Sequence, residues 1–298
     1  MKQDYQQLLK PEIIKSVSGL ALIAKVIVDG YLNGLNHSRR VGAGMEFSQY
    51  RGYEPGDDLR LLDWKMLARS GRYYIKQSEV ETNISVKFIL DASNSMLHEE
   101  NKLEKMDFAR VLIASLAYLS QNQGDAVGLF ALNDKKLYSV YPKVQKQHFN
   151  RLLLELINVE NEGKWPLDPL STEKLHDRRH KELIFFITDM YEQDEELSRL
   201  IKRLKTTRNE VVVLHLMGKS EIEFNYTGTV TFEDLETGAK VKVEAKEAKK
   251  HYLDSLNFNL NKNKEIMLSN GISYHIFRMD EPIFEILQVF LKQRNNLI

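Results

Sequence analysis

The chain has 298 residues, of which 43% are hydrophobic, and its 42 basic residues equal its 42 acidic residues in number. This length allows one large domain or two modest ones, and the hydrophobic content excludes a globally disordered chain. The charge balance argues against a general nucleic-acid or membrane-surface binder. Because there is no cysteine, disulfides, thiolate metal sites and cysteine nucleophiles are excluded.

The first residues lack the compact apolar segment of a signal peptide. The apolar stretch Val17 to Val28 is interrupted by Lys25 and is too short to span a bilayer. We therefore expect a soluble, cytoplasmic protein without a transmembrane segment. Apolar residues recur at helical spacing over residues 4–33, which predicts one helix that packs on the main domain and ends near Gly34.

Residues 37–81 are rich in glycine and in charges of both signs, with a strong turn signal at residues 55–58. We expect an irregular segment with one or two helical turns within 58–68 and a short strand at 73–75. Its charges are explained either by internal ion pairs or by a docking surface for an acidic partner. If the charges form internal ion pairs, we expect these pairs to hold the segment against the sheet. The expected pairs join Arg51, Arg60 and Arg69 to Asp57, Asp58 and Asp63.

From residue 84 onward, apolar runs alternate with amphipathic segments. The predicted strands are 86–90, 125–132, 136–141, 183–187, 210–216 and 272–277, and the predicted helices are 105–121, 147–159, 192–207, 247–269 and 282–294. This alternation predicts an α/β fold with a doubly wound, mostly parallel sheet. Alternating apolar and polar residues at about 219–245 predict a small antiparallel β insertion. The expected organisation is residues 1–83 packed on an α/β domain of residues 84–298.

Oxygen-bearing side chains follow two of the predicted strands. The apolar run before residue 91 ends abruptly in Asp91, with Ser93 and Ser95 close behind, and a second run ends at Asp189. Ligands of open α/β sheets bind beyond the carboxyl ends of the strands, so neighbouring strands would bring both aspartates to one rim. Carboxylate and hydroxyl oxygens suit Mg²⁺, Mn²⁺ or Ca²⁺. The alternative explanation is helix capping by aspartate and serine.

The run Asp91-Ala-Ser93-Asn-Ser95 resembles the metal-ion-dependent adhesion site of von Willebrand factor A domains. This resemblance implies that the two serines bind Mg²⁺ directly, that Asp91 acts through water and that Asp189 is the second aspartate. It also implies a threonine ligand after the helix predicted at 147–159. The loop at residues 163–167, where this threonine is expected, contains none. Ser171 and Thr172 come slightly later, and Asp168 is the candidate that would replace the threonine as a ligand.

A longer set of motifs, within residues 44–69, resembles one particular family. Residues 44–47, 51–60, 63–65 and 68–69 resemble the signature of domain-of-unknown-function family 58, and residues 234–238 and 290–294 also fit. Members of this family often accompany MoxR-type AAA+ ATPases. The resemblance therefore implies a protein partner of that type and a role in assembling or activating other complexes.

Three functions are compatible with these features. The first is a non-enzymatic interaction module, in which a partner's acidic side chain completes the coordination of a divalent cation. The second is a scaffold whose degenerate site binds no metal. The third is a haloacid dehalogenase-like phosphotransfer enzyme with Asp91 as nucleophile, but that chemistry needs a second carboxylate two residues on, where the chain has Ser93.

Overall fold

The computed structural model describes residues 8–38, 49–53, 64–77, 84–166, 181–192 and 195–297. Two compact units are present, one made of Met1–Leu32 with Asn83–Ile298 and the other of Asn33–Thr82. The contacts thus divide the chain at two points, whereas the sequence suggested a single boundary near residue 83.

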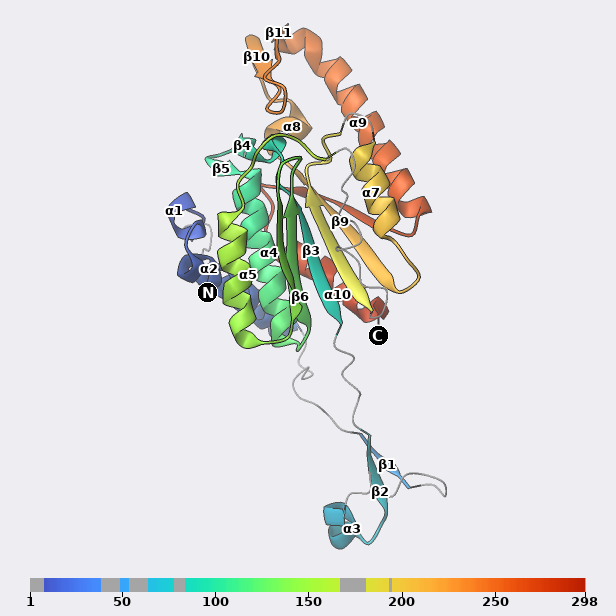
Figure 1. Ribbon diagram of the computed structural model, residues 1–298. Coiled ribbons are helices and arrows are strands. Elements are labelled where there is room, and N and C mark those ends of the chain that lie inside the picture. The colour runs from blue at the N-terminus through green and yellow to red at the C-terminus, as the bar shows by residue number, and fades with distance from the viewer. Residues whose placement is uncertain are drawn as a thin grey trace. The chain divides into compact units, whose positions relative to one another are not determined.

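The larger unit is built on a six-stranded sheet with the order β12-β9-β8-β3-β6-β7 (Figure 1). Only β7 runs antiparallel to its neighbour, and the other four pairings are parallel. The expected doubly wound, mostly parallel sheet is therefore confirmed. The strands are β3 Ser85–Asp91, β6 Ala126–Leu132, β7 Leu137–Lys143, β8 Glu182–Thr188, β9 Asn209–Met217 and β12 Ser273–Arg278.

Helices cover both faces of this sheet (Figure 1). One layer contains α4 Lys105–Asn122, α5 Lys146–Asn158 and α10 Phe284–Leu297, and the other contains α7 Glu196–Leu204 and α9 Ala245–Ser269. Side chains alternate across a strand, so each strand feeds both layers. Phe185 stacks on Phe88 and packs against Phe290 of α10, with ring centroids 5.7 Å apart in each pair. Its neighbour Phe186 lies in the opposite core, with Leu197 of α7.

The N-terminal segment forms two helices, α1 Pro11–Ile14 and α2 Val17–Ser38, where the sequence predicted one. The interruption falls at Ser16, whose hydroxyl donates to the Ile13 carbonyl at 3.0 Å and accepts from the Gly19 amide at 3.1 Å. These local bonds end one helix and begin the next. The predicted stop at Gly34 is also wrong, because α2 continues to Ser38. In the described part of the chain, no helix combines the length and hydropathy needed to cross a membrane.

The predicted insertion contains the antiparallel pair β10 Thr229–Glu233 and β11 Lys240–Glu244. The prediction is wrong for the start of this insertion, because residues 219–223 form the helix α8 Lys219–Glu223 and not a strand. The Glu221 carboxylate accepts the Gly218 backbone amide at 2.6 Å, which closes the first turn of α8. Two short elements were not predicted. They are the 3₁₀ helix η3 Asn94–Leu97 and the ribbon of β4 Glu99–Glu100 with β5 Leu103–Glu104.

The smaller unit contains the antiparallel pair β1 Gln49–Gly52 and β2 Tyr74–Gln77, together with helix α3 Trp64–Ser70. Tyr53 and Tyr73 pack against each other with ring centroids 6.1 Å apart. Trp64 leaves 64% of its surface exposed. The hypothesis that arginines and aspartates pair here concerns residues 57, 58, 60 and 63, which lie outside the described residues.

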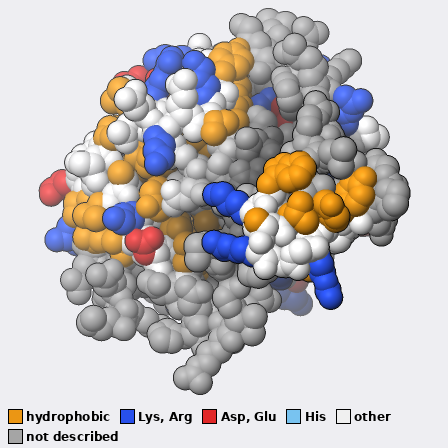
Figure 2. Space-filling model, turned by 90° about the horizontal axis from the view of Figure 1, so that it is seen from below, with side chains coloured by type: hydrophobic (Ala, Val, Ile, Leu, Met, Phe, Trp, Pro, Cys, Tyr) orange, Lys and Arg blue, Asp and Glu red, His pale blue; other side chains and the backbone are white. Residues whose placement is uncertain are grey.

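Charges of both signs reach the surface of the described residues. On the face seen in Figure 2, lysine and arginine side chains are interspersed with hydrophobic and acidic ones. This distribution agrees with the equal totals of basic and acidic residues in the sequence.

Candidate functional site

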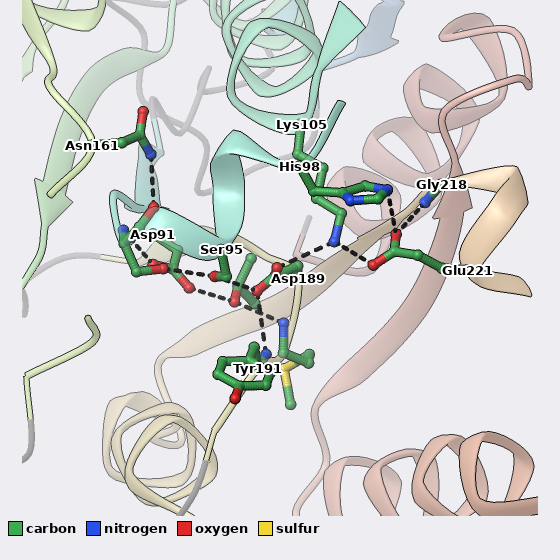
Figure 3. A network of polar contacts seen from close by, with 12 residues as sticks. Asp91, Ser95, His98, Lys105, Asn161, Asp189, Tyr191, Gly218 and Glu221 are labelled. Carbon is green, nitrogen blue, oxygen red and sulfur yellow. Dashed lines mark hydrogen bonds and ion pairs between the residues drawn. The ribbon is translucent and has the colours of Figure 1, made fainter. Parts of the chain in front are cut away.

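The site lies where strands β3 and β8 end, side by side. The two strands pair in parallel, with Leu90 opposite Ile187, so Asp91 and Thr188 leave the sheet at the same edge. Both strands are buried and covered by helices on their two faces, which agrees with the apolar runs at residues 88–90 and 183–187. The polar residues that follow therefore gather on one rim of the sheet (Figure 3).

The four residues singled out in the sequence meet on this rim. The Asp91 carboxylate accepts the Ser93 backbone amide at 3.0 Å. The Ser93 and Ser95 hydroxyl oxygens are 2.9 Å apart, and Ser95 donates to Asp189 Oδ1 at 3.1 Å. A continuous chain of oxygen atoms thus runs from the loop after β3 to the loop after β8. Whether these residues hold a metal stays a prediction.

A second loop braces the residues after β3. Asn161 Nδ2 donates to the Ser93 carbonyl at 2.9 Å (Figure 3), and the Glu162 amide donates to the Ala92 carbonyl at 3.1 Å. The Asn94 amide in turn donates to the Gly163 carbonyl at 3.0 Å. This second loop is where the resemblance implied a threonine ligand. Its residues 161–166 include none, and Asp168, Ser171 and Thr172 lie outside the described residues.

A buried lysine, missed in the sequence, contacts the second aspartate. Lys105 is 3% exposed at the start of α4, and its ammonium donates to Asp189 Oδ2 at 3.2 Å and to Glu221 Oε1 at 2.8 Å (Figure 3). His98 Nε2 lies 3.8 Å from the other oxygen of Glu221. A lysine at a helix start usually lies in solvent, so no sequence pattern marked Lys105 as part of the site.

Thr188, next to Asp189 in the sequence, was also missed. Its hydroxyl donates to Asp91 Oδ2 at 2.8 Å and accepts the Met190 amide at 2.9 Å. Thr188 therefore connects the two loops from below the rim. The signal that could have identified it is its position as the last residue of a buried strand, where a lone hydroxyl needs a polar partner.

His215 is buried on β9, opposite Thr188. Its Nδ1 atom lies 2.6 Å from the Tyr274 hydroxyl. Burial lowers the pKa of His215 to about 4, even though Asp189 nearby favours the protonated ring. The imidazole is therefore neutral at physiological pH and adds no positive charge to the rim.

The two aspartates have opposite pKa shifts. Burial and the negative charge of Asp189 raise the pKa of Asp91 to about 6, and hydrogen bonds from Ser93 and Thr188 only partly oppose this. Burial also disfavours ionised Asp189, but the Lys105 ammonium outweighs it and holds the pKa of Asp189 below its usual value. At pH 7 both carboxylates are thus mostly ionised. Of the two, only Asp189 contacts a cationic side chain among the described residues.

The helix-capping alternative is not supported at this rim. Ser93 precedes the 3₁₀ helix η3 without a side-chain capping bond. The helices that follow on each side, α4 and α7, have Glu104 and Glu195 at their N-cap positions. The aspartates and serines therefore bond mainly to each other, to their own loops and to Lys105.

The donor set fits a hard divalent cation, because it consists of carboxylate and hydroxyl oxygens only. No group of three or more histidine or acidic side chains in the described part of the chain is placed to hold a metal by itself. Any cation on this rim would therefore need the hydroxyls of Ser93 and Ser95 as ligands. Lys105 also opposes a cation here, because its ammonium already binds an oxygen of Asp189.

The chain is similar in sequence to two relatives that are described as uncharacterized. Uncharacterized proteins of Mycobacterium bovis and Mycobacterium tuberculosis are 24% identical over 235 residues, which cover 76% of this chain and 72% of each relative. Among solved structures, the conserved hypothetical protein BatB from Bacteroides thetaiotaomicron gives a TM-score of 0.46 at 14% identity, with 72% of this chain and 100% of that chain covered. An aerotolerance-related membrane protein from Bacteroides fragilis gives 0.48 at 16% identity with the same coverage.

A third structure, the PilB minor pilin from Streptococcus sanguinis, gives a TM-score of 0.46 at 11% identity, with 76% of this chain and 66% of that chain covered. The family comparison is the decisive one. The family model described as "Protein of unknown function DUF58" matches residues 49–257, which is more than half of the chain. The chain therefore belongs to the DUF58 family.

Proposed function

We propose that this protein is a non-enzymatic interaction module that binds its partner through a divalent cation at the rim of Asp91, Ser93, Ser95 and Asp189. The observation that supports the proposal most is the hydrogen bond from Ser95 to Asp189, which brings donors from two distant loops within reach of one ion. The expected cation is Mg²⁺, with Mn²⁺ and Ca²⁺ as alternatives. When bound, it supplies a coordination position that an acidic side chain of the partner can fill.

Each residue of the rim has a separate role in this proposal. Ser93 and Ser95 present hydroxyl oxygens from a loop held in place by its backbone bonds to residues 161–163. Asp91 orients that loop through the Ser93 amide and contributes negative charge from below. Lys105 fixes the orientation of Asp189 by holding its Oδ2 atom, so that Oδ1 faces Ser95.

The partner that we propose is a MoxR-type AAA+ ATPase, and the role is the assembly or activation of other complexes. The support for this partner is the resemblance of the sequence to a family whose members accompany such ATPases. An acidic residue on the partner's surface is the group that the proposed site would recognise, since a bound cation attracts a carboxylate.

A scaffold with a degenerate site is the second candidate. The specific observation in its favour is Lys105, whose ammonium already compensates the charge of Asp189 without any metal. A phosphotransfer enzyme is disfavoured by the loop after β3, where Ser93 stands at the position of the required proton donor.

Partner binding with and without a chelator tests this proposal. The purified chain is immobilised and exposed to the MoxR-type ATPase of the same organism, first in Mg²⁺ and then in EDTA. The proposal predicts binding that EDTA abolishes and that Ser95→Ala weakens at least tenfold. Ser115→Ala is the matched control, because Ser115 is a buried serine of α4 that bonds only the Val111 carbonyl at 2.8 Å.

Binding that is equally strong in EDTA would favour the scaffold over the cation-dependent module. Loss of binding in Ser115→Ala to the same extent as in Ser95→Ala would point to general destabilisation instead of a role for the rim.

A further inference from the structure

The strand β12 forms one edge of the large sheet, and a groove runs along its outer side. Among the described strands, β12 pairs only with β9. The groove has a volume of about 450 Å³ and is lined by residues of α9, β12 and α10, among them Lys264, Ile276 and Val289. Ile276 leaves 38% of its surface exposed, and Phe284 at the start of α10 leaves 40%. An edge strand with exposed apolar side chains is suited to pair with a further strand.

The backbone of β12 has free hydrogen-bonding groups on its outer side. The Met279 amide, directly after the strand, donates to the Met217 carbonyl of β9 at 3.0 Å. Because the backbone groups of successive residues point to opposite sides of a strand, the N–H and C=O groups of Ile276 point away from β9. These two groups have no partner among the described residues. The free edge of β12 is therefore centred on Ile276.

The opposite edge strand of the sheet, β7, is protected in a way that β12 is not. β7 contains Pro142, which has no N–H to donate, and its pairing with β6 is irregular between Val127 and Leu129. Proline and irregular pairing both keep an edge strand from pairing with another chain. β12 contains no proline, and all six of its residues pair in regular register with β9. The difference favours β12 as an interface.

The charges of α10 suit a second copy of the same chain. Glu285, Gln288 and Lys292 are exposed, line the groove and lie on one face of the helix, because three and four residues separate them. Glu285 and Lys292 are about 10 Å apart along the helix axis, too far to pair with each other. Neither has an ion-pair partner among the described residues. If two copies of α10 lie antiparallel across an axis at Gln288, Glu285 of each copy faces Lys292 of the other.

The same axis passes through the free edge of β12. Gln293 Nε2 donates to Ser273 Oγ at 2.8 Å, so the end of α10 lies beside the start of β12. Ile276 is about 10 Å from Ser273 along the strand, and Gln288 is about 7.5 Å from Gln293 along the helix. Ile276 and Gln288 therefore lie at nearly the same height, and one two-fold axis serves both the strand and the helix.

We propose that the chain forms a symmetric homodimer in which β12 pairs antiparallel with β12 of a second copy, centred on Ile276. The pairing joins two six-stranded sheets into one and gives the outward backbone groups of each Ile276 a partner. It also forms two ion pairs between Glu285 and Lys292, one on each side of the axis. The inference is independent of the cation site, because this interface shares no residue with the rim.

A charge-swap experiment on the full chain tests the dimer. Sedimentation equilibrium is measured for the wild type, Glu285→Lys, Lys292→Glu and the double variant. Each single reversal replaces two attractions by two repulsions, so we expect the Kd of the dimer to rise about tenfold or more. The double variant restores both pairs in reversed order and should return the Kd to within about threefold of the wild type. Asp254→Lys is the control, because Asp254 is exposed on α9 and does not line the groove.

Ile276→Pro tests the strand pairing separately. Its N–H points away from β9, so proline at this position should preserve the sheet but abolish the dimer. Far-ultraviolet circular dichroism and the melting temperature show whether the variant folds. A wild type that stays monomeric at all concentrations would overturn the proposal and leave the groove for a strand of another protein. A dimer that resists Ile276→Pro and both charge reversals, or a double variant that stays dissociated, would also overturn it.

Discussion

Ser95 donates a hydrogen bond to Asp189 across 3.1 Å, although 94 residues separate them in the sequence. The parallel pairing of β3 with β8 makes this contact, because it ends both strands at one edge of the sheet. The same edge collects Lys105 and Thr188, so the rim is a network of bonded groups rather than a set of independent side chains.

Lys105→Met should destabilise the protein in the absence of metal, and Mn²⁺ should restore much of the loss. Removal of the ammonium leaves buried Asp189 without its cationic partner, which typically costs about 3–5 kcal/mol. A divalent cation on the rim can replace that charge. Thermal unfolding with and without Mn²⁺ measures the effect, and the stabilisation by Mn²⁺ should be larger in Lys105→Met than in the wild type.

Lys87→Met is the matched control for this experiment. Lys87 is also buried and also pairs with a buried carboxylate, that of Glu182, but it lies on the sheet away from the rim. Its loss should destabilise the fold, and Mn²⁺ should stabilise this variant only as much as it stabilises the wild type, because the rim is unchanged. Equal rescue of both variants by Mn²⁺ would mean that the ion acts elsewhere on the protein.

Ionisation of Asp91 should reduce stability as the pH rises. Its pKa in the folded protein is about 6, above the ordinary value of 3.8, so the folded state holds the proton more tightly than the unfolded state. Stability from the protonated form is complete below about pH 4 and is lost as the pH rises through 6. The wild type should therefore lose up to about 3 kcal/mol relative to Asp91→Asn between pH 4 and pH 7.5 in metal-free buffer.

Urea unfolding of both proteins at a series of pH values measures this difference. The change with pH is the informative quantity, because Asp91→Asn also alters the bonds to Ser93 and Thr188 by an amount that does not depend on pH. If the difference in the free energy of unfolding between the two proteins stays constant from pH 4 to pH 7.5, folding does not raise the pKa of Asp91.

Thr188→Val should raise the pH needed for cation binding. The Thr188 hydroxyl stabilises ionised Asp91, so its removal raises the pKa of Asp91 further. The midpoint of Mn²⁺ affinity against pH is expected to move upward, while the affinity at pH 8.5 changes little. Thr229→Val serves as control, since Thr229 bonds only Glu244 on the exposed face of the hairpin. If the midpoint does not move, the Thr188 hydroxyl does not influence the pKa of Asp91.

The sequence predicted the sheet well, because buried parallel strands appear as short apolar runs that need no distant information. It also predicted that Asp91 and Asp189 would face one rim if their strands were neighbours, and the pairing of β3 with β8 makes them so. Lys105 could not be predicted, because its partners Asp189 and Glu221 lie 84 and 116 residues away. Glu221 was expected in a strand, because apolar and polar residues alternate after it. In the structure it lies in α8, and its carboxylate caps the start of that helix.

The helix break at Ser16 was missed for a related reason. Apolar periodicity continues through residues 13–20, and only the side-chain bonds of Ser16 show that the backbone leaves the helix there. Hydrogen bonds of single hydroxyl groups decide such details, and residue patterns do not record them.

Calorimetric titration of the wild type and Asp189→Asn with Mn²⁺ tests the cation site most directly. Asp189 supplies the oxygen that Ser95 contacts, and Asn keeps its shape while removing its charge. The proposed cation site predicts that one Mn²⁺ binds per wild-type chain and that Asp189→Asn lowers its affinity at least tenfold. A wild type that gives no binding heat and no stabilisation by Mn²⁺, or an Asp189→Asn variant with wild-type affinity, would contradict it.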